Sequence, residues 1–258
     1  MTSHQAFAEG RLAEAVSLQE TAVAENPTDP AERLLLVQLL MFAGRLADAR
    51  THLALIDSDD PDWPELARSF LRLMRAEHRR SIGRAPVVRP EPTPLHAKRR
   101  WRAIKAIRQA RPEDAVRLID RADAASPEVR GFLDAQEFER LRDADDRFAS
   151  VLEGFVGGEY VWFAWEGIRS VRLEPAKYAR DRLFRPAEVR LIDGTVFPAH
   201  LPLVYPRSHT ADGVFATGLE TDYVCPDGGP TRCIGGKLLL VGHGAEVPLA
   251  GVRMIEIR

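Results

Sequence analysis

Three histidines and two cysteines in the C-terminal half carry the side chains best suited to chemistry: His200, His209, His243, Cys225 and Cys233. An enzymatic or small-ligand-binding module built on His200 and His243 would need these groups to converge with a carboxylate in one concave pocket. The two cysteines are eight residues apart, whereas zinc ligands on a tight knuckle are usually separated by two to four residues. The spacing therefore predicts no metal site. The alternative is a pair of loop or strand cysteines flanking Gly228-Gly229-Pro230.

A dense acidic group, Asp143, Asp145 and Asp146, stands directly before Arg147. Clustered carboxylates could bind a cation or take part in acid–base catalysis. The same pattern also occurs where carboxylates cap a helix start and pair with a neighbouring arginine. We favour this second, structural interpretation.

A basic stretch runs from Lys98 to Arg102, with Trp101 inside it and Lys105 following. Such a stretch could meet phosphates while the tryptophan stacks on a base. The whole chain, however, has 36 basic and 38 acidic side chains and a formal charge of −2, so no global field attracts nucleic acid or anionic lipid. A solvated helix face, or a landing place for an acidic peptide, is the preferred interpretation, and neither nucleic acid nor membrane is expected as a partner.

Recognisable catalytic motifs are missing from the sequence. It contains no glycine-rich phosphate loop, no serine elbow and no helix with paired zinc-binding histidines. It also has no apolar opening segment of signal-peptide type and no run of 18 apolar residues. Two cysteines do not form a disulfide framework. We therefore expect a cytoplasmic protein that is not an enzyme, with no catalytic residues, metal or cofactor.

The elements that position these residues begin with an internal repeat. The phrase from Gly10 to Ala15 returns, displaced by 34 residues, as the phrase from Gly44 to Ala49. A period of 34 is typical of tetratricopeptide helical hairpins, which bury their apolar faces against one another and commonly bind a peptide or another chain. A fainter third copy, formed by Ala115, Ala122 and Pro127, keeps the spacing of Ala15, Ala22 and Pro27. The alternative is coincidence among alanine-rich amphipathic helices.

The pattern after this repeat predicts an α+β protein. Helices are expected over 31–43, 63–80, 98–110 and 112–125, with an extended proline-rich connector at 84–96. A further helix is expected from about 137 to 155, ending at Gly157-Gly158. Beyond it, alternating β-branched and aromatic residues and the Asp193-Gly194 turn predict a mixed, mainly antiparallel sheet. The predicted domains are a tetratricopeptide-like helical domain at 1–130 and an α+β domain at 131–258.

The repeat register also predicts a binding surface, because the first helix of each tetratricopeptide hairpin lines the concave side of the array. The segment 31–43 offers an apolar stripe with one polar residue, and 98–110 adds a charge and an aromatic ring. An amphipathic partner helix needs apolar anchors and a charge that fixes its register. The predicted partner-binding residues are Leu34, Gln38, Met41, Arg100, Trp101 and Ile104. The alternative is that Leu34 and Met41 are ordinary core residues.

The order of features resembles the ImpE/TagJ family, accessory proteins of bacterial type VI secretion systems. The matching segments are Gly10–Leu12 with Ala15, Asn26-Pro27, Leu36–Leu40 with Gly44, Phe138, Asp143–Asp145 with Arg147, Val151–Glu153, Gly158–Tyr160, Arg185–Ala187, Asp193–Thr195, Leu201-Pro202 and Tyr205-Pro206. The chain departs from the family pattern at 160–165, where relatives usually carry Tyr-Trp-Val-Pro-Phe. The resemblance implies a non-enzymatic adaptor that binds the N-terminal helical segment of the contractile-sheath subunit TssB. Through it, the adaptor would influence sheath assembly, or recycling by the ClpV unfoldase.

Overall fold

The computed structural model describes residues 1–211 and 213–258. Its α-helices are α1 (Ser3–Ala8), α2 (Leu12–Glu25), α3 (Pro30–Phe42), α4 (Leu46–Ala54), α5 (Trp63–Ser81), α6 (Leu95–Arg108) and α7 (Pro112–Asp123). Its strands are β1 (Val87–Arg89), β2 (Gly131–Leu133), β3 (Gln136–Phe138), β4 (Leu141–Asp143), β5 (Val151–Val156), β6 (Glu159–Ala164), β7 (Ile168–Leu173), β8 (Phe184–Leu191), β9 (Val196–Pro202), β10 (Thr221–Val224), β11 (Arg232–Gly235), β12 (Leu238–Val241), β13 (Ala245–Pro248) and β14 (Met254–Ile257). Helices come first and strands dominate afterwards, which confirms the predicted fold class.

The repeated glycines end the first helix of each N-terminal hairpin. Gly10 and Gly44 follow the C-caps of α1 and α3 with φ of +80° and +69°, the left-handed conformation that glycine adopts most readily. The equivalent alanines, Ala15 on α2 and Ala49 on α4, are fully buried and let the helices approach closely. At the start of α3, the Asp29 carboxylate accepts hydrogen bonds from the backbone N–H groups of Ala31 and Glu32. The sequence repeat is therefore a structural repeat.

Most strands form one large sheet with the order β1-β6-β5-β9-β8-β7-β14-β2-β3. Two smaller sheets, β13-β12-β4 and β10-β11, complete the β-rich part of the chain. Among the strand pairs of the described residues, only β1 and β6 are parallel. The turn at Asp193-Gly194 joins β8 to β9, as predicted. The expectation of a mixed, mainly antiparallel sheet is confirmed.

Two segments differ from the sequence-based expectation. The proline-rich connector contains β1, whose residues Val87–Arg89 pair with Val161–Phe163 of β6, so it contributes an edge strand to the large sheet. The segment 137–155 is not a helix but holds β3, β4 and β5. Residues 151–155 are buried on both faces of the sheet, and such a continuous buried run lacks the alternation that distinguishes a strand from a helix.

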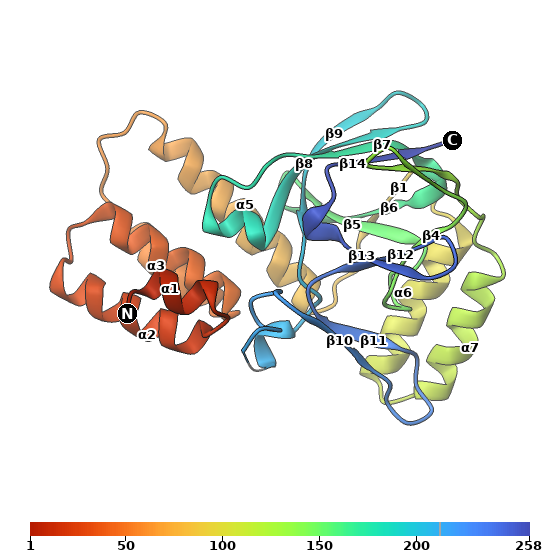
Figure 1. Cartoon of the computed structure of the whole chain (residues 1–258), viewed down its shortest axis with the longest axis horizontal. Coiled ribbons are helices and arrows are strands. Elements are labelled where there is room, and N and C mark those ends of the chain that lie inside the picture. The colour runs from red at the N-terminus through yellow and green to blue at the C-terminus, as the bar shows by residue number, and fades with distance from the viewer. Residues whose placement is uncertain (212) are drawn as a thin grey trace.

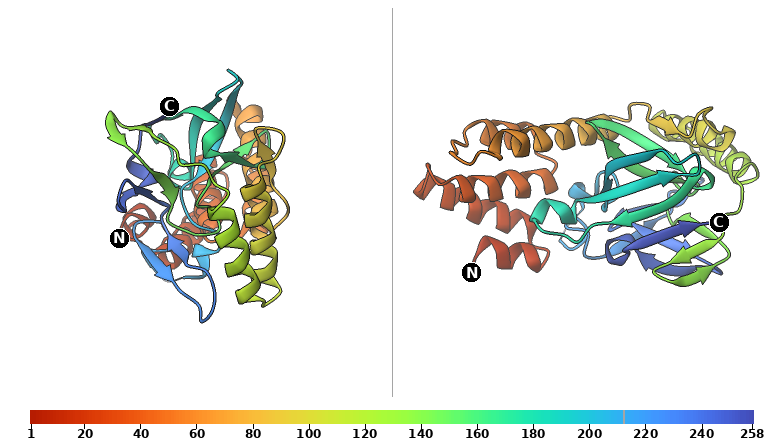
Figure 2. Two further views of the ribbon diagram at one scale, coloured as in Figure 1. Left: turned by 90° about the vertical axis from the view of Figure 1, so that its right-hand side faces the viewer. Right: turned by 90° about the horizontal axis from the view of Figure 1, so that it is seen from above.

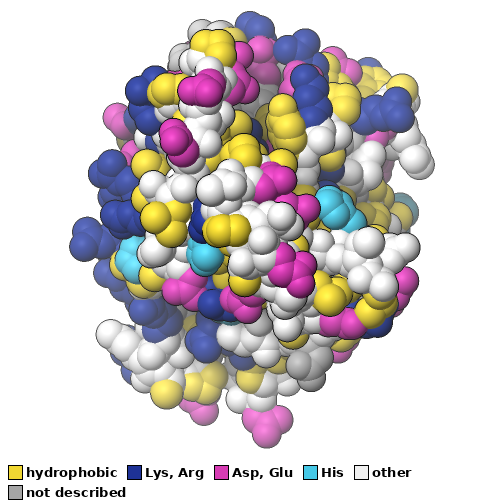
Figure 3. All heavy atoms as spheres, turned by 90° about the vertical axis from the view of Figure 1, so that its left-hand side faces the viewer, with side chains coloured by type: hydrophobic (Ala, Val, Ile, Leu, Met, Phe, Trp, Pro, Cys, Tyr) yellow, Lys and Arg dark blue, Asp and Glu magenta, His cyan; other side chains and the backbone are white. Residues whose placement is uncertain are grey.

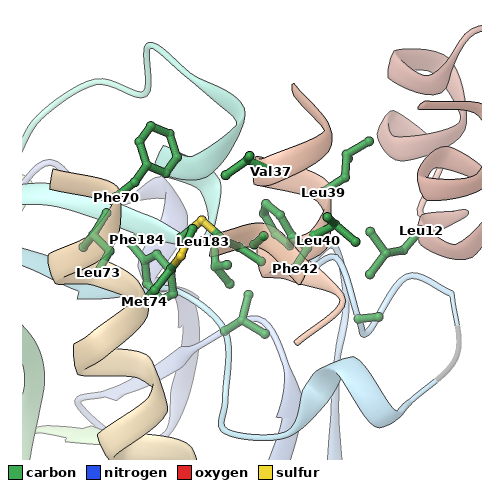
Figure 4. Close-up of a cluster of buried hydrophobic side chains, with 14 of the residues drawn as sticks. Leu12, Val37, Leu39, Leu40, Phe42, Phe70, Leu73, Met74, Leu183 and Phe184 are labelled. Atoms are coloured by element: carbon green, nitrogen blue, oxygen red, sulfur yellow. The ribbon is translucent and has the colours of Figure 1, made fainter. Parts of the chain in front are cut away.

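Helices α5 and α6 cover one face of the large sheet, and the array α1–α4 extends beyond it (Figures 1 and 2). Side chains alternate accordingly along β5 and β6: Phe155 and Trp162 face the helices, whereas Leu152 and Phe163 join a second core with the small sheet β13-β12-β4. Figure 4 shows the first core, where side chains of α3 and α5 meet Leu183 and Phe184. One continuous core therefore joins the helical array to the sheet, across the predicted domain boundary.

The described helices include none that combines the length and apolar character needed to cross a lipid bilayer.

Candidate partner-binding groove

The inner face of the helical array is occupied by the chain itself. The 3₁₀ helix η2 (Ala179–Arg182), which precedes β8, lies against the first helices of the hairpins. The backbone N–H of Arg180 donates to Oε1 of Gln38 on α3 at 2.9 Å. The Arg180 guanidinium lies 4.4 Å from the ring centre of Phe70 on α5, and the Arg182 guanidinium lies 4.8 Å from that of Phe7 on α1. All three helices therefore bind one internal segment.

A second internal segment closes the edge of the same array. A Cβ atom added to Gly10 would lie 2.8 Å from the Val214 side chain, and one added to Gly44 would lie 2.7 Å from the His209 ring. The two repeated turns thus contact one loop of the C-terminal half. The outer face of the array mixes apolar, acidic and basic side chains without one large apolar patch (Figure 3).

The structure separates the six predicted binding residues into three groups. Gln38 and Met41 are buried, and Leu34 is half-buried against the main core. Gln38 is 7% exposed and Arg100 is 1% exposed, so neither side chain is open to a partner in solution. Helical periodicity identified the face of α3 that Leu34, Gln38 and Met41 share, but it could not reveal that segments far along the chain cover that face.

Arg100 is committed to contacts within the chain. Its guanidinium donates to the Ser150 hydroxyl at 2.6 Å, to the Asp146 carbonyl at 2.5 Å and to the Asp123 carboxylate. These contacts fix α6 to α7 and to the loop before β5. Arg100 therefore positions the helix that carries Trp101 and Ile104, rather than meeting a partner itself.

Trp101 and Ile104 line an open groove of about 400 Å³ between α6, the end of α5 and the sheet. Ile107 continues their apolar wall along α6, and Phe148 and Pro206 are further apolar residues that line the groove. A neighbouring cavity of about 240 Å³ shares Arg80, Ser81 and Arg207 with the groove and is lined by Met41. Of the predicted residues, Trp101 and Ile104 thus reach the groove and Met41 reaches the adjoining cavity.

Five arginines line the groove: Arg80, Arg108, Arg147, Arg207 and Arg232. Arg80 pairs with Glu77 and Glu153, and Arg147 pairs with Asp145. Within residues 1–211 and 213–258, no carboxylate lies within 4.0 Å of the other three guanidinium groups. Burial and the nearby Arg147 charge lower the pKa of Arg232. The groove therefore combines an apolar wall with an excess of positive charge.

Buried ion pairs form the floor beneath the groove. Arg80 donates from Nε and Nη2 to the two carboxylate oxygens of Glu153, at 2.9 Å each. Lys237 lies 2.9 Å from Glu153 and 2.7 Å from Asp143, and the Tyr205 hydroxyl donates to Asp143 at 2.6 Å. Burial raises the pKa of Glu153, but the charges of Arg80 and Lys237 outweigh burial and hold it well below its usual range. The network joins α5 to the sheet.

The acidic cluster noted in the sequence serves this network and the turn that follows β4. Asp145 pairs with Arg147 and accepts the backbone N–H of Cys233, while Asp146 pairs with Arg142. Pairing with a neighbouring arginine is confirmed, but the expected helix start is a turn. Asp143, Asp145 and Asp146 therefore all pair with groups of the chain itself.

The histidines and cysteines do not form one site. His200 lies on β9 opposite Phe155, His209 lies in the 3₁₀ helix at Ser208–Thr210, and His243 is exposed in the turn between β12 and β13. Cys225 is exposed, whereas Cys233 is buried. Within the described parts of the chain, no group of three or more His, Cys, Asp or Glu side chains is arranged to hold a metal ion.

A constellation that the sequence did not suggest joins Ser150, His96 and Glu166. The His96 ring lies 2.7 Å from the Ser150 hydroxyl through Nδ1 and 2.6 Å from Glu166 through Nε2. Serine hydrolases use the opposite nitrogens, and here the hydroxyl also accepts from Arg100 while His96 is only 1% exposed. We interpret the group as an anchor for α6. No local spacing could have revealed it, because its members lie 54 and 70 residues apart.

Comparison with known proteins fits this division of the chain. Residues 135–256 match the model of the ImpE protein family, and residues 6–72 match a tetratricopeptide repeat model. The type VI secretion system accessory component TagJ of Pseudomonas aeruginosa is 28% identical over 261 residues, spanning 99% of this chain and 91% of that protein. Residues 135–256 are thus similar to the ImpE family, and the chain as a whole is similar to TagJ.

A solved structure has the same fold as this chain. The crystal structure of protein VPA1032 from Vibrio parahaemolyticus matches it with a TM-score of 0.89. The match covers 99% of this chain and 97% of that chain at 21% sequence identity. The helical array and the large sheet are thus arranged as in that structure.

Proposed function

We propose that this chain is a non-enzymatic, cytoplasmic accessory protein of a bacterial type VI secretion system. The observation that carries the proposal is the open groove beside α6, which pairs an apolar wall with arginine side chains on a chain that is similar to TagJ. The histidines and cysteines are dispersed, and the buried carboxylates are used internally, which supports a binding role rather than catalysis.

The proposed partner is the N-terminal helical segment of the sheath subunit TssB. An amphipathic helix can place its apolar side chains on Trp101, Ile104 and Ile107, which lie on one side of α6 at helical spacing. The inner face of α1, α3 and α5 is a poorer candidate, because η2 already covers it. By holding this TssB segment, the protein would influence sheath assembly, or sheath recycling by the ClpV unfoldase.

The test is a calorimetric titration of the full chain with a synthetic peptide of the TssB N-terminal segment from the same genome. Trp101→Ala removes a large apolar contact from the groove and should weaken binding by about tenfold or more. Trp63→Ala is the matched control, because Trp63 is also half-buried but lies outside the groove. Wild-type affinity in the folded Trp101→Ala variant would contradict the groove as the binding site, and no binding by the wild type would contradict the proposed partner.

A further inference from the structure

Three of the groove arginines are placed where carboxylates of another molecule can pair with them. Arg108 projects from the last turn of α6, Arg207 from the loop after β9, and Arg232 from the start of β11. Three segments far apart in sequence thus bring like charges to one concavity. Like charges repel, and the described residues that line the groove include no acidic side chain.

Two details show that this arrangement is unfavourable in the free protein. The Nε of Arg232 is buried without a hydrogen-bond partner among the described residues, and a buried donor that stays unpaired is destabilising. Arg207 has φ of +70°, in the left-handed region that bulky residues seldom adopt. Backbone strain that presents a charged side chain at a concave surface points to a binding role.

The shape of the surface favours a helix over a small ion. Trp101, Ile104 and Arg108 follow the i, i+3, i+7 positions of one side of α6, so the apolar wall and its flanking charge extend along a helix axis. The neighbouring cavity, which shares Arg80 and Arg207 with the groove, extends the concave surface further. A single phosphate would neutralise arginines but would leave the apolar wall exposed to water.

We propose that the groove selects an acidic amphipathic helix, whose carboxylates pair with Arg108, Arg207 and Arg232 while its apolar face covers Trp101, Ile104 and Ile107. This inference rests on the proposed function for the identity of the natural partner, but the chemistry of the groove can be tested without it. Charge-assisted hydrogen bonds from guanidinium to carboxylate are stronger than neutral ones and fix the register of the bound helix.

The experiment compares two synthetic helical peptides of equal length and identical apolar stripe, one flanked by glutamates and the other by glutamines at the same positions. Fluorescence anisotropy with the full chain should show binding of the glutamate peptide that is about tenfold or more tighter than that of the glutamine peptide. Arg207→Gln and Arg232→Gln should each weaken the glutamate peptide by about three- to tenfold and leave the glutamine peptide unchanged. Higher salt should reduce the difference between the peptides.

The control variant is Arg169→Gln, because Arg169 is an exposed arginine on β7 that lines none of the cavities described above. Equal affinity for the two peptides, or unchanged affinity in both groove variants, would overturn the inference. Inorganic phosphate that binds the free protein at Arg232 and displaces the glutamate peptide at low millimolar concentration would also overturn it, in favour of a small-anion site. The TssB peptide, measured in parallel, separates the two proposals: if it fails to bind while the glutamate peptide binds, only the proposed partner is wrong.

Discussion

Replacing Arg80 by leucine should destabilise the whole molecule, because Arg80 neutralises a carboxylate that has no access to water. The Arg80 side chain is 3% exposed and the Glu153 side chain is 0% exposed. The guanidinium makes two hydrogen bonds to Glu153 and a third, at 3.0 Å, to the Val204 carbonyl. Breaking a buried ion pair by removing one partner typically costs about 3–5 kcal/mol. For a chain of this size, that corresponds to a fall in Tm of roughly 6–20 °C.

The charge count of the network sharpens this expectation. Arg80 and Lys237 face the three carboxylates of Glu77, Glu153 and Asp143, so Arg80→Leu leaves one positive charge facing three carboxylates. Adding Glu153→Gln removes the buried carboxylate that has lost its partner, and the double variant should therefore be more stable than Arg80→Leu alone. The pKa of Glu153 is depressed in the folded wild type, so its stabilising effect is present above the carboxyl pKa of the unfolded chain and is lost as pH falls. Arg80→Leu should consequently lose less stability at acidic pH than at pH 7.

Urea unfolding followed by circular dichroism measures both effects. The matched control is Arg68→Leu on the same helix, because Arg68 pairs with Glu65 and both side chains are 61% exposed. An exposed pair contributes about 0–1 kcal/mol, so this control should remain close to wild type. A loss below about 1 kcal/mol in Arg80→Leu would refute the reasoning that this network joins α5 to the sheet.

Three further predictions concern other parts of the chain. Burial and the Arg180 charge lower the pKa of His200 to about 4, so the unfolded chain takes up a proton that the folded chain does not, and stability should fall as pH drops from about 6.5 to 4. His200→Gln should flatten that slope in urea titrations, His243→Gln should not, and equal slopes in all three proteins would contradict the assignment. Gln38→Ala should cost about 1–3 kcal/mol, because it leaves the buried backbone N–H of Arg180 without its acceptor, whereas the exposed Gln109→Ala should change stability by less than about 0.5 kcal/mol. Cys225 is exposed and burial raises the pKa of Cys233 to about 12, so a thiol reagent should modify one cysteine in the native protein and both in urea. Rapid native modification of both, or stoichiometric zinc that is lost in Cys225→Ser, would contradict this prediction.

Local sequence signals were sufficient for much of the fold. The glycines at positions 10 and 44 predicted two equivalent helix ends, and Asp193-Gly194 predicted the turn between β8 and β9. These features depend on the conformational preferences of a few neighbouring residues. Local signals failed where burial was complete, as in β5, because a strand buried on both faces lacks the alternation that distinguishes it from a helix.

The candidate site was harder to predict, because contacts between distant segments decide it. Gln38 has the spacing of a binding residue on the inner face of the array, and it does bind a peptide segment, but that segment is η2, 142 residues further along the chain. Arg207 and Arg232 lie in the same groove as Trp101 only because the folded chain brings the loop after β9 and strand β11 next to α6. No periodicity or motif encodes such a meeting.

Hydrogen exchange of the full chain, with and without the TssB N-terminal peptide, tests the central claim most directly. The account predicts that bound peptide slows amide exchange over α6 and over the groove segments near Arg207 and Arg232, and leaves α1 and α3 unchanged. Protection confined to α1, α3 and η2 would place the partner on the inner face of the helical array and would contradict the account.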